Sequence, residues 1–221
     1  MKVGTDGVLL GAWAEGGRHI LDIGTGTGVI ALMMAQRFPD SQVTAIDIDE
    51  SAVLQAHENI VASPFHDRVE VLHTSIQDFP HHSQLSLRES PIINYQLSII
   101  NSIISNPPFF IDSLRAPDQQ RSTARHTDTL TYEELMQSAT RLLSDDGVVS
   151  VIVPFDYRCR MDDAAVFAGL FPSRVCAVTT KEGKSPRRYL LAYRKHPCLC
   201  HHEQLTIGSP TYHALTHDFY L

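Results

Sequence analysis

The feature that most constrains the fold of this chain is a glycine-rich turn, with the sequence GTGTG at residues 24–28. An apolar run at residues 19–23 precedes the turn, and a helical pattern follows it at residues 28–37. Glycines at such a strand-to-helix turn let the backbone bend sharply and approach a ligand closely. The turn therefore predicts the first βα unit of an α/β fold, with a ligand site at the end of its strand.

The rest of the chain continues this alternation of apolar runs and helical patterns. Such an alternation predicts a mostly parallel sheet with right-handed crossovers, in a single domain that spans residues 1–221. The sequence GKSP at residues 183–186 is typical of a turn, and it predicts that the strands on either side, at residues 174–179 and 189–193, form an antiparallel hairpin. Further strands are expected at residues 43–46, 69–72, 98–104, 148–153, 174–179 and 189–193, with a short one at 205–207, and further helices at residues 51–61, 132–143 and 162–170.

Two segments show no clear period. Residues 80–97 are rich in Ser, His and Pro at a place where an α/β fold normally has a crossover helix, and we expect a long surface loop there. Residues 195–221 form a C-terminal extension, which is expected to begin with a loop at residues 196–202.

The composition is that of an ordinary soluble globular protein, with 43% hydrophobic and 19% charged residues. Its apolar runs are far shorter than the roughly 20 residues that span a bilayer, and the first residues have no signal-peptide core. The 4 cysteines are too few for a disulfide framework, which fits a reducing compartment. We therefore expect a cytoplasmic protein that does not contact a membrane.

The net charge and the metal-ligating residue types narrow the range of partners. A formal charge of −7 argues against a protein that coats nucleic acid without specificity, because neutralising phosphates needs clustered Lys and Arg. Two local basic clusters remain, at residues 115–126 and 181–188.

The segment Cys198-Leu199-Cys200-His201-His202 is too tightly spaced to supply four tetrahedral zinc ligands. We expect no bound metal.

The residues around the glycine turn indicate which ligand it holds. A dinucleotide fingerprint has the spacing G-x-G-x-x-G, whereas this turn reads G-x-G-x-G with Val29 at the place of the third glycine. Asp22 comes just before the turn, and its carboxylate would repel the pyrophosphate of a dinucleotide. The same carboxylate would attract the amino group or the sulfonium of S-adenosylmethionine. The turn thus favours S-adenosylmethionine over a dinucleotide.

Polar residues after the next two strands are candidates for the rest of this cofactor. Asp47 ends the second strand, where a carboxylate can accept hydrogen bonds from both ribose hydroxyls. Asp49 is expected to cap the helix that follows. After the third strand, Ser75 and Asp78 lie where they can meet the adenine amino group of the cofactor. A plain surface-loop role for Asp78 is equally open.

The tetrapeptide Asn-Pro-Pro-Phe at residues 106–109 is the candidate catalytic motif of the chain. It follows the predicted fourth strand, at the edge of the sheet where α/β folds bind ligands. The side-chain oxygen of Asn106 and the carbonyl of Pro107 can accept both hydrogens of a planar amino group, and Phe109 offers a face for stacking. Alone, the string is also typical of a β-turn. Together with the glycine turn it predicts methylation of a planar exocyclic nitrogen, which needs positioning more than a strong base.

These residues and several longer motifs resemble the family of bacterial tRNA1(Val) (adenine-37-N6)-methyltransferases. The likeness covers nearly the whole chain and rests on MKVGTDGVLLGAW at residues 1–13, DIGTGTG at 22–28, SNPPFF at 105–110, RSTARH at 121–126 and DFYL at 218–221. It implies a Rossmann-like, seven-stranded and mostly parallel sheet with a reversed last strand. It also implies S-adenosylmethionine as methyl donor and, as substrate, the adenine immediately 3′ of the anticodon in a valine tRNA.

The resemblance also implies roles for individual residues. Those that would hold the cofactor are Gly24, Gly26 and Asp47. Those that would hold the flipped adenine are Asn106, Pro107 and Phe109. Those that would contact tRNA phosphates are Arg121, Arg125, Lys184 and Arg187.

The chain departs from the family pattern at three places. The family usually carries a further stretch before the opening motif, which implies that residues 1–15 are a lid segment that has lost part of its length. Ser75 stands where many relatives have an aspartate for the adenine of the cofactor, which moves part of that role to Asp78. Ile100-Asn101 replaces an aromatic-Asp pair at the start of the fourth strand.

Two alternatives stay open from the sequence. The Asn-Pro-Pro-aromatic motif also serves guanine-N2 methylation of rRNA and glutamine methylation of proteins, whose enzymes carry duplicated or helical domains that this sequence lacks. The other alternative is a noncatalytic RNA-binding protein that keeps the fold. The sequence carries no signal for the oligomeric state.

Overall fold

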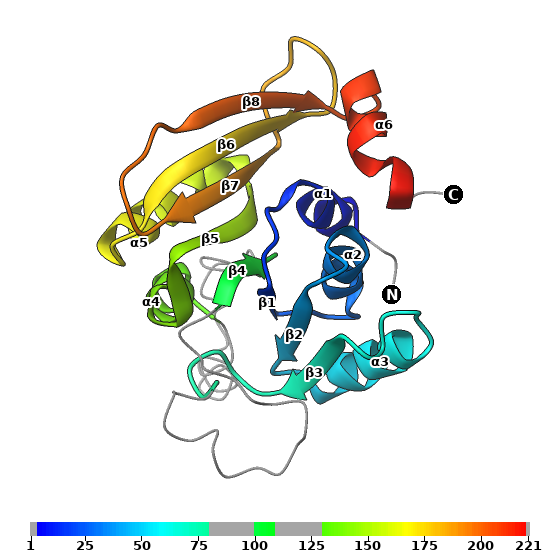
Figure 1. Cartoon of the computed structure of the whole chain (residues 1–221). Coiled ribbons are helices and arrows are strands. Elements are labelled where there is room, and N and C mark those ends of the chain that lie inside the picture. Colours follow the sequence, from blue (N-terminus) through cyan, green and yellow to red (C-terminus); the bar gives the residue numbers. More distant parts are fainter. Residues whose placement is uncertain (1–3, 80–99, 109–129, 220–221) are drawn as a thin grey trace, which may run out of the picture.

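A computed structural model of the chain describes residues 4–79, 100–108 and 130–219 (Figure 1). The strands are β1 (His19–Ile23), β2 (Gln42–Asp47), β3 (Val69–His73), β4 (Ile100–Ser105), β5 (Leu143–Pro154), β6 (Phe171–Thr179), β7 (Arg188–Arg194) and β8 (His201–Thr206). The helices are α1 (Thr5–Trp13), α2 (Val29–Arg37), α3 (Glu50–Val61), α4 (Tyr132–Leu142), α5 (Arg158–Phe167) and α6 (Pro210–Thr216), and two short 3₁₀ helices are η3 (Phe155–Tyr157) and η4 (His217–Phe219).

The described strands form one sheet in the order β3-β2-β1-β4-β5-β7-β6-β8. Strands β3, β2, β1, β4 and β5 run parallel to one another. Strand β7 is antiparallel to both of its neighbours, β5 and β6, and β8 adds to β6 in parallel. The predicted Rossmann-like α/β fold, with its parallel strands and C-terminal hairpin, is confirmed.

Alternate side chains of each strand enter two separate cores, as the pleat of a strand requires. Leu21 and Ile23 of β1 pack with residues of α4 and α5, whereas Ile20 packs with residues of α1, α2 and α3. Tyr212 of α6 joins the core of α1 and α2, which lie side by side in Figure 1. Because both faces are covered, β5 is buried at every position of residues 147–153 rather than at every second one.

Helix α1 is tied to elements that are far away in the sequence. Arg37 of α2 donates to two backbone carbonyls at the end of α1, each at 2.7 Å. The buried Trp13 donates from its Nε1 to Glu203 in β8 at 3.0 Å, and the guanidinium of Arg174 in β6 lies 4.3 Å from the centre of its ring. The N-terminal segment is therefore an integral part of the domain.

The structure differs from the sequence-based expectation at two places. Residues 196–202, predicted as a loop, include the first residues of β8, which adds an eighth strand to the sheet. The first four residues of β8 are exposed at the edge, so the strand has no apolar alternation to reveal it. Helix α5 begins at Arg158 rather than at residue 162, because η3 leads directly into it. The surface loop predicted at residues 80–97 lies outside the described residues.

Candidate functional site

The carboxyl ends of β1, β2 and β4 meet at one edge of the sheet. The register aligns the last residue of β1 with Ile46 of β2 on one side and with Ser105 of β4 on the other. The residues that come next in the chain, Gly24, Asp47 and Asn106, therefore begin three adjacent loops at this edge. The three segments predicted to hold cofactor and substrate thus lie side by side, at the edge where α/β sheets bind ligands.

The glycine turn leaves open space above its backbone. Gly24, Gly26 and Gly28 have φ angles of 70°, 58° and 82°, in the left-handed region that favours glycine. A Cβ atom built at Gly24 or Gly26 would meet no other atom within 4 Å, so a ligand has room there. At Gly28 it would lie 3.4 Å from the Cβ of Ala56, which makes this glycine a packing residue. The amide of Gly24 donates to the carbonyl of Ile46 at 2.9 Å and holds the turn on β2.

Asp22 is a fully buried carboxyl group directly beneath this turn. Its Oδ2 accepts a hydrogen bond from the hydroxyl of Thr25 at 2.6 Å, and its Oδ1 has no hydrogen-bond partner in the described part of the chain. Burial raises the pKa of Asp22 to about 7, the Thr25 hydrogen bond opposes this rise, and the negative charge of Asp47 adds to it. A positively charged group nearby would favour the ionised carboxylate. The site therefore fits a ligand with an amino or sulfonium group.

Asp47 is half-buried and holds two neighbouring loops together. Its Oδ2 accepts the amide of Gly26 at 2.8 Å, and its Oδ1 accepts the amide of Asp49 at 3.0 Å. Each carboxylate oxygen retains acceptor capacity for a ribose hydroxyl. Asp49 itself caps α3 by accepting the amide of Ser51 at 2.9 Å, as predicted. The role of Asp47 at the ribose stays a prediction.

Ser75 and Asp78 form one local unit after β3. The hydroxyl of Ser75 donates to Asp78 Oδ2 at 2.7 Å, and the amide of Asp78 donates back to the Ser75 oxygen at 3.0 Å. The amide of Thr74 also donates to the backbone carbonyl of Asp47 at 3.0 Å, which places the unit next to the end of β2. The two residues that the sequence offers as alternatives for the adenine of the cofactor are thus hydrogen-bonded to each other, and their role at the cofactor stays a prediction.

Asn106 follows the buried end of β4, where the hydroxyl of Ser105 donates to the carbonyl of Ile23 at 2.8 Å. The Oδ1 of Asn106 is shielded from solvent and has no hydrogen-bond partner among the described residues. A buried acceptor left without a donor costs about 1–3 kcal/mol. Such a cost is expected where a ligand supplies the missing hydrogen bond. Pro107, the second predicted acceptor, is buried beside it.

The basic turn at residues 180–187 lies at the same edge of the sheet. Strand β6 runs in the direction of β5, since both are antiparallel to β7, and it enters this turn at its carboxyl end. Lys184 and Arg187 are exposed, and neither forms an ion pair within the described part of the chain. Arg188 forms an ion pair with Asp6 of α1 at 2.8 Å. Two cations of the turn are therefore available for an anionic partner.

Phe109, Arg121 and Arg125 are predicted site residues that lie outside the described residues. The structure in turn adds two polar residues to this edge. Thr25 bonds Asp22, a contact that the D-x-x-T spacing across a tight turn could have indicated. The role of Asp6 could not be predicted from its neighbours in the sequence, because its partner Arg188 lies 182 residues further along the chain.

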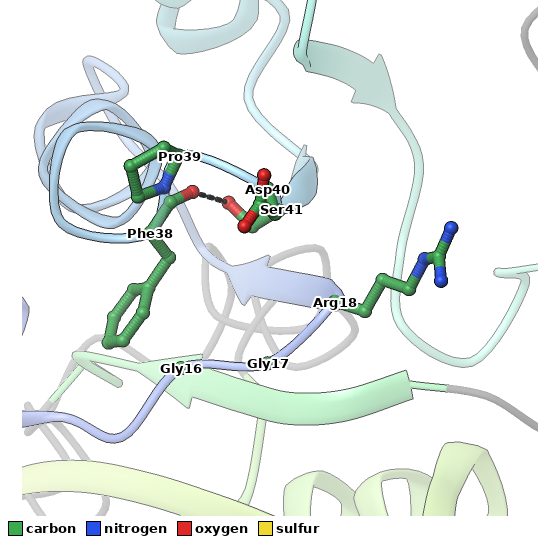
Figure 2. Close-up of a pocket in the computed structure, with 7 residues that line it drawn as sticks. All are labelled: Gly16, Gly17, Arg18, Phe38, Pro39, Asp40 and Ser41. Carbon is green, nitrogen blue, oxygen red and sulfur yellow. Dashed lines mark hydrogen bonds between the residues drawn. The ribbon is translucent and has the colours of Figure 1, made fainter.

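A hollow lies at the opposite edge of the sheet (Figure 2). It is lined by residues that precede β1 and β2, namely Gly16, Gly17, Arg18, Phe38, Pro39, Asp40 and Ser41. The side chain of Ser41 donates to the carbonyl of Phe38 at 2.7 Å, and the side chain of Arg18 extends away from the Phe38 ring (Figure 2). This hollow is separate from the candidate site, which lies at the carboxyl ends of the strands.

The described residues contain neither a cluster of metal-binding side chains nor a membrane-spanning helix. Within residues 4–79, 100–108 and 130–219, three or more His, Cys, Asp or Glu side chains never gather as a metal ion would need. None of the helices in these ranges is both long and apolar enough to cross a membrane.

The sheet order and the site at its carboxyl edge define a methyltransferase of the Rossmann-like, S-adenosylmethionine-dependent class. Residues 4–164 match the family described as "Methyltransferase small domain". The structure is similar to that of a predicted O-methyltransferase from Agrobacterium tumefaciens, with a TM-score of 0.68, 18% identity and 96% of each chain covered. It is also similar to geranyl diphosphate C-methyltransferase from Streptomyces coelicolor, solved with S-adenosyl-L-homocysteine, with a TM-score of 0.56, 13% identity, and 84% of this chain and 74% of that chain covered. These two likenesses concern the fold.

Curated relatives identify the particular family. Proteins named tRNA1(Val) (adenine(37)-N6)-methyltransferase are 44% identical in Bacteroides thetaiotaomicron and 47% identical in Phocaeicola vulgatus, each covering 100% of this chain and 91% of the relative. The protein of that name in Vibrio parahaemolyticus is 41% identical and covers 100% of this chain and 89% of the relative. The chain belongs to this family of tRNA methyltransferases, whose methyl donor is S-adenosylmethionine. The resemblance found in the sequence is thereby confirmed.

Proposed function

We propose that the chain transfers the methyl group of S-adenosylmethionine to N6 of an adenine in tRNA, and that its target is adenine-37 in the anticodon loop of tRNA1(Val). The names of the relatives support this choice of substrate. The observation that carries the proposal is the shielded Oδ1 of Asn106, which lacks a donor among the described residues and lies one strand away from the glycine turn. Because the proposed substrate is tRNA, we also propose that the protein acts in the cytoplasm.

The cofactor end of the site is proposed to work through three groups. The open space above Gly24 and Gly26 would admit the donor next to the backbone. The buried carboxylate of Asp22 would stabilise its positive charge, and Asp47 would accept hydrogen bonds from its ribose hydroxyls. Ser75 and Asp78, held together by two hydrogen bonds, would meet its adenine. When bound, the donor supplies an electrophilic methyl carbon attached to a sulfonium.

At the substrate end, Asn106 and Pro107 would orient the amino group. The Oδ1 of Asn106 and the carbonyl oxygen of Pro107 would each accept one of the two N6 hydrogens. Held in this way, the nitrogen directs its lone pair out of the ring plane and toward the glycine turn. Positioning of this kind supplies most of the rate, and the proton of the methylated nitrogen leaves after attack without a strong base.

The remaining predicted residues would bind the rest of the tRNA. Phe109 would stack on the flipped adenine, and Lys184 and Arg187 would contact backbone phosphates together with Arg121 and Arg125. An anticodon loop suits this site because its bases are unpaired and cost little to flip.

The test is a methylation assay with the purified chain. We would incubate tRNA from a strain that lacks this protein with labelled S-adenosylmethionine, digest the tRNA and identify the labelled nucleoside. The expected product is N6-methyladenosine, in valine tRNA alone. A valine tRNA in which adenine-37 is replaced by guanine should remain unlabelled.

Other outcomes would overturn the proposal in distinct ways. Labelled N2-methylguanosine or a labelled protein would move the activity to another acceptor. Binding of tRNA without labelling, combined with no thermal shift on addition of S-adenosylmethionine, would indicate a noncatalytic RNA-binding protein.

A further inference from the structure

Two aromatic rings lie together where β5 and β7 meet at the carboxyl edge. Phe155 directly follows β5, and its ring stacks on that of Tyr189 in β7, with 5.9 Å between centroids and 27° between planes. The Phe155 side chain is 46% exposed, although its size and character suit a core. Exposed aromatic side chains beside a functional site are candidates for ligand contact.

The pairing of β5 with β7 sets this aromatic pair against the basic turn. Pro154 aligns with Arg188, and the amide of Phe155 donates to the carbonyl of Arg187 at 3.1 Å. Phe155 and Arg187 thus face each other across the two strands. The residue that carries the exposed ring and a residue whose cation has no ion-pair partner in the described chain are therefore neighbours through their backbones.

The pair also lies near the proposed methylation site. Strand β5 is the neighbour of β4, and Ser105 aligns with Val151. Asn106 therefore lies level with Ile152, and Phe155 follows three residues later. At about 3.3 Å per residue, this offset amounts to roughly 10 Å along the strand. A nucleotide next to a target held at Asn106 would fall in this range.

The charges around the rings favour a nucleic acid as the occupant. Lys184 and Arg187 lie in the turn beside Phe155, and the guanidinium of Arg158 lies 4.6 Å from the centre of the Tyr189 ring. The charge of Arg158 is partly offset by Asp162, 3.3 Å away. An aromatic face flanked by cations combines base stacking with phosphate binding, as in proteins that bind single-stranded nucleic acid.

We propose that Phe155, supported by Tyr189, is a stacking platform for an unpaired tRNA base that flanks the target adenine, while Arg187 holds a neighbouring phosphate. The inference rests on the proposed function for the identity of the target. Flipping the adenine takes away a stacking partner from its neighbours, and a protein ring that receives one of them offsets part of that loss. Phe155 is thus a specificity-determining residue that acts beside the reaction rather than in it.

The first test compares substitutions at Phe155 in a tRNA binding assay, with S-adenosylhomocysteine present to fill the cofactor site. Phe155→Ala should raise the Kd for valine tRNA about tenfold, as expected for one stacked base. Phe155→Leu should weaken binding as much, because it restores apolar volume but no aromatic face, and Phe155→Trp should bind like the wild type. Affinity for S-adenosylhomocysteine should not change.

Phe167 provides a matched control for this test. It is a phenylalanine at the last position of α5 and is 87% exposed. Because it immediately precedes the segment that leads to the amino end of β6, it lies away from the carboxyl edge. Phe167→Ala should therefore leave tRNA binding unchanged, which separates a platform at Phe155 from a general effect of removing a surface ring.

A second test locates the base. Anticodon stem-loops of valine tRNA with one abasic residue at each loop position would be bound to the wild type and to Phe155→Ala. At one position next to the target, the missing base should cost the wild type about tenfold and cost Phe155→Ala nothing further, which is the signature of a direct contact.

The outcomes distinguish this inference from the proposed function. If the wild type methylates tRNA while Phe155→Ala or Phe155→Leu binds it with wild-type affinity, the platform is refuted and the function stands. If the wild type does not methylate tRNA but the abasic coupling is found, the function fails and the platform remains an RNA contact. If Phe155→Ala instead dissociates an oligomer of the free protein, the rings belong to an interface between copies and the inference is wrong.

Discussion

The two ends of β4 carry the same side chain in opposite states. At the amino end, the Oδ1 of Asn101 accepts the amides of Arg18 and His19 at 3.1 and 3.0 Å. At the carboxyl end, the Oδ1 of Asn106 is shielded from solvent and accepts no hydrogen bond within the described residues. Asn101 therefore anchors the backbone at the start of β1, whereas the side-chain oxygen of Asn106 is an acceptor without a donor. The amide of Asn101 stabilises the fold, and that of Asn106 is proposed to serve binding.

The same contrast extends along the two edges of the sheet. At the amino edge, Arg68 donates to three backbone carbonyls in the last turn of α2 and just after it, and ion pairs join Arg174 to Glu203 and Arg194 to Glu15. At the carboxyl edge, Asp22 keeps an oxygen without a partner in the described chain, and the space above the glycine turn is open. The carboxyl edge thus combines open space with two shielded oxygens, those of Asp22 and Asn106, that lack a hydrogen-bond partner within the described residues, and these are the groups proposed to meet a ligand.

The largest effect should come from exchanging the two asparagines for alanine. Asn106→Ala should lower kcat about 100- to 1,000-fold, as expected when one preorganised hydrogen-bond partner of a transition state is lost. It should not lower Tm, because the removed oxygen has no partner among the described residues. Methyl transfer to tRNA and thermal unfolding are the two measurements.

Asn101→Ala should show the reverse pattern. The backbone amides of Arg18 and His19 lose their acceptor, which costs about 0.5–1.5 kcal/mol for each hydrogen bond because neither donor is fully buried, while kcat of the folded fraction stays at the wild-type value. A fall in Tm for Asn106→Ala equal to that of Asn101→Ala would remove the distinction between the two edges.

The second prediction concerns the pH dependence caused by Asp22. Its folded pKa of about 7 lies above the value of 3.8 for an ordinary carboxyl, so the folded state keeps a proton that the unfolded state has lost. The stability of the free protein should therefore fall as pH rises from about 4 to about 7, by at most about 4 kcal/mol from this group. Binding of S-adenosylmethionine should tighten over the same range, because the positive ligand favours the carboxylate.

Asp22→Asn isolates this contribution. The amide keeps an acceptor for Thr25 but cannot ionise, so the difference in urea unfolding between the variant and the wild type should change across this pH window and stay constant above it. Calorimetry of cofactor binding should show proton release below pH 7 for the wild type and none for the variant. A pH-independent difference would contradict the assignment.

The third prediction separates the cations of the two edges. Lys184→Ala and Arg187→Ala should each weaken tRNA binding severalfold and reduce the slope of log Kd against log salt by about 1, as for one lost phosphate contact. Arg18→Ala removes one exposed charge at the amino edge and should leave that slope unchanged (Figure 2). Equal slopes for all three variants would mean that only the net charge matters.

The smallest effect is expected from the ion pair at the amino edge. Glu203→Ala removes the partner of Arg174 and the acceptor of Trp13. Because the side chains of Glu203 and Arg174 are partly exposed, the loss should be about 1 kcal/mol, or roughly 2–4 °C in Tm. Trp13 is the sole tryptophan of the chain, so its fluorescence reports the change directly. A loss of kcat in this variant would link the two edges.

The sequence was sufficient where the signal is local. The glycine turn, the Asp49 cap and the alternating apolar runs depend on residues that are close together in the chain, and the structure contains the fold that they predict. The adjacency of Gly24, Asp47 and Asn106 also follows, because parallel strands bring their ends to one edge. Contacts between residues that are distant in the sequence and partly polar could not be predicted, because no local sequence pattern marks them. The first residues of β8, outside the short strand predicted at residues 205–207, and the Phe155–Tyr189 stack are examples, since exposed edge residues and exposed rings have no periodic pattern.

Helix α1 has a consequence for biosynthesis. Besides its packing on α2, two of its contacts join residues 182 and 190 positions apart, namely Asp6 with Arg188 and Trp13 with Glu203. On the ribosome, this helix emerges long before its partners in β7 and β8 are translated. A nascent chain can therefore pack α1 on α2 early, but the polar contacts that fix α1 to β7 and β8 form only near the end of translation.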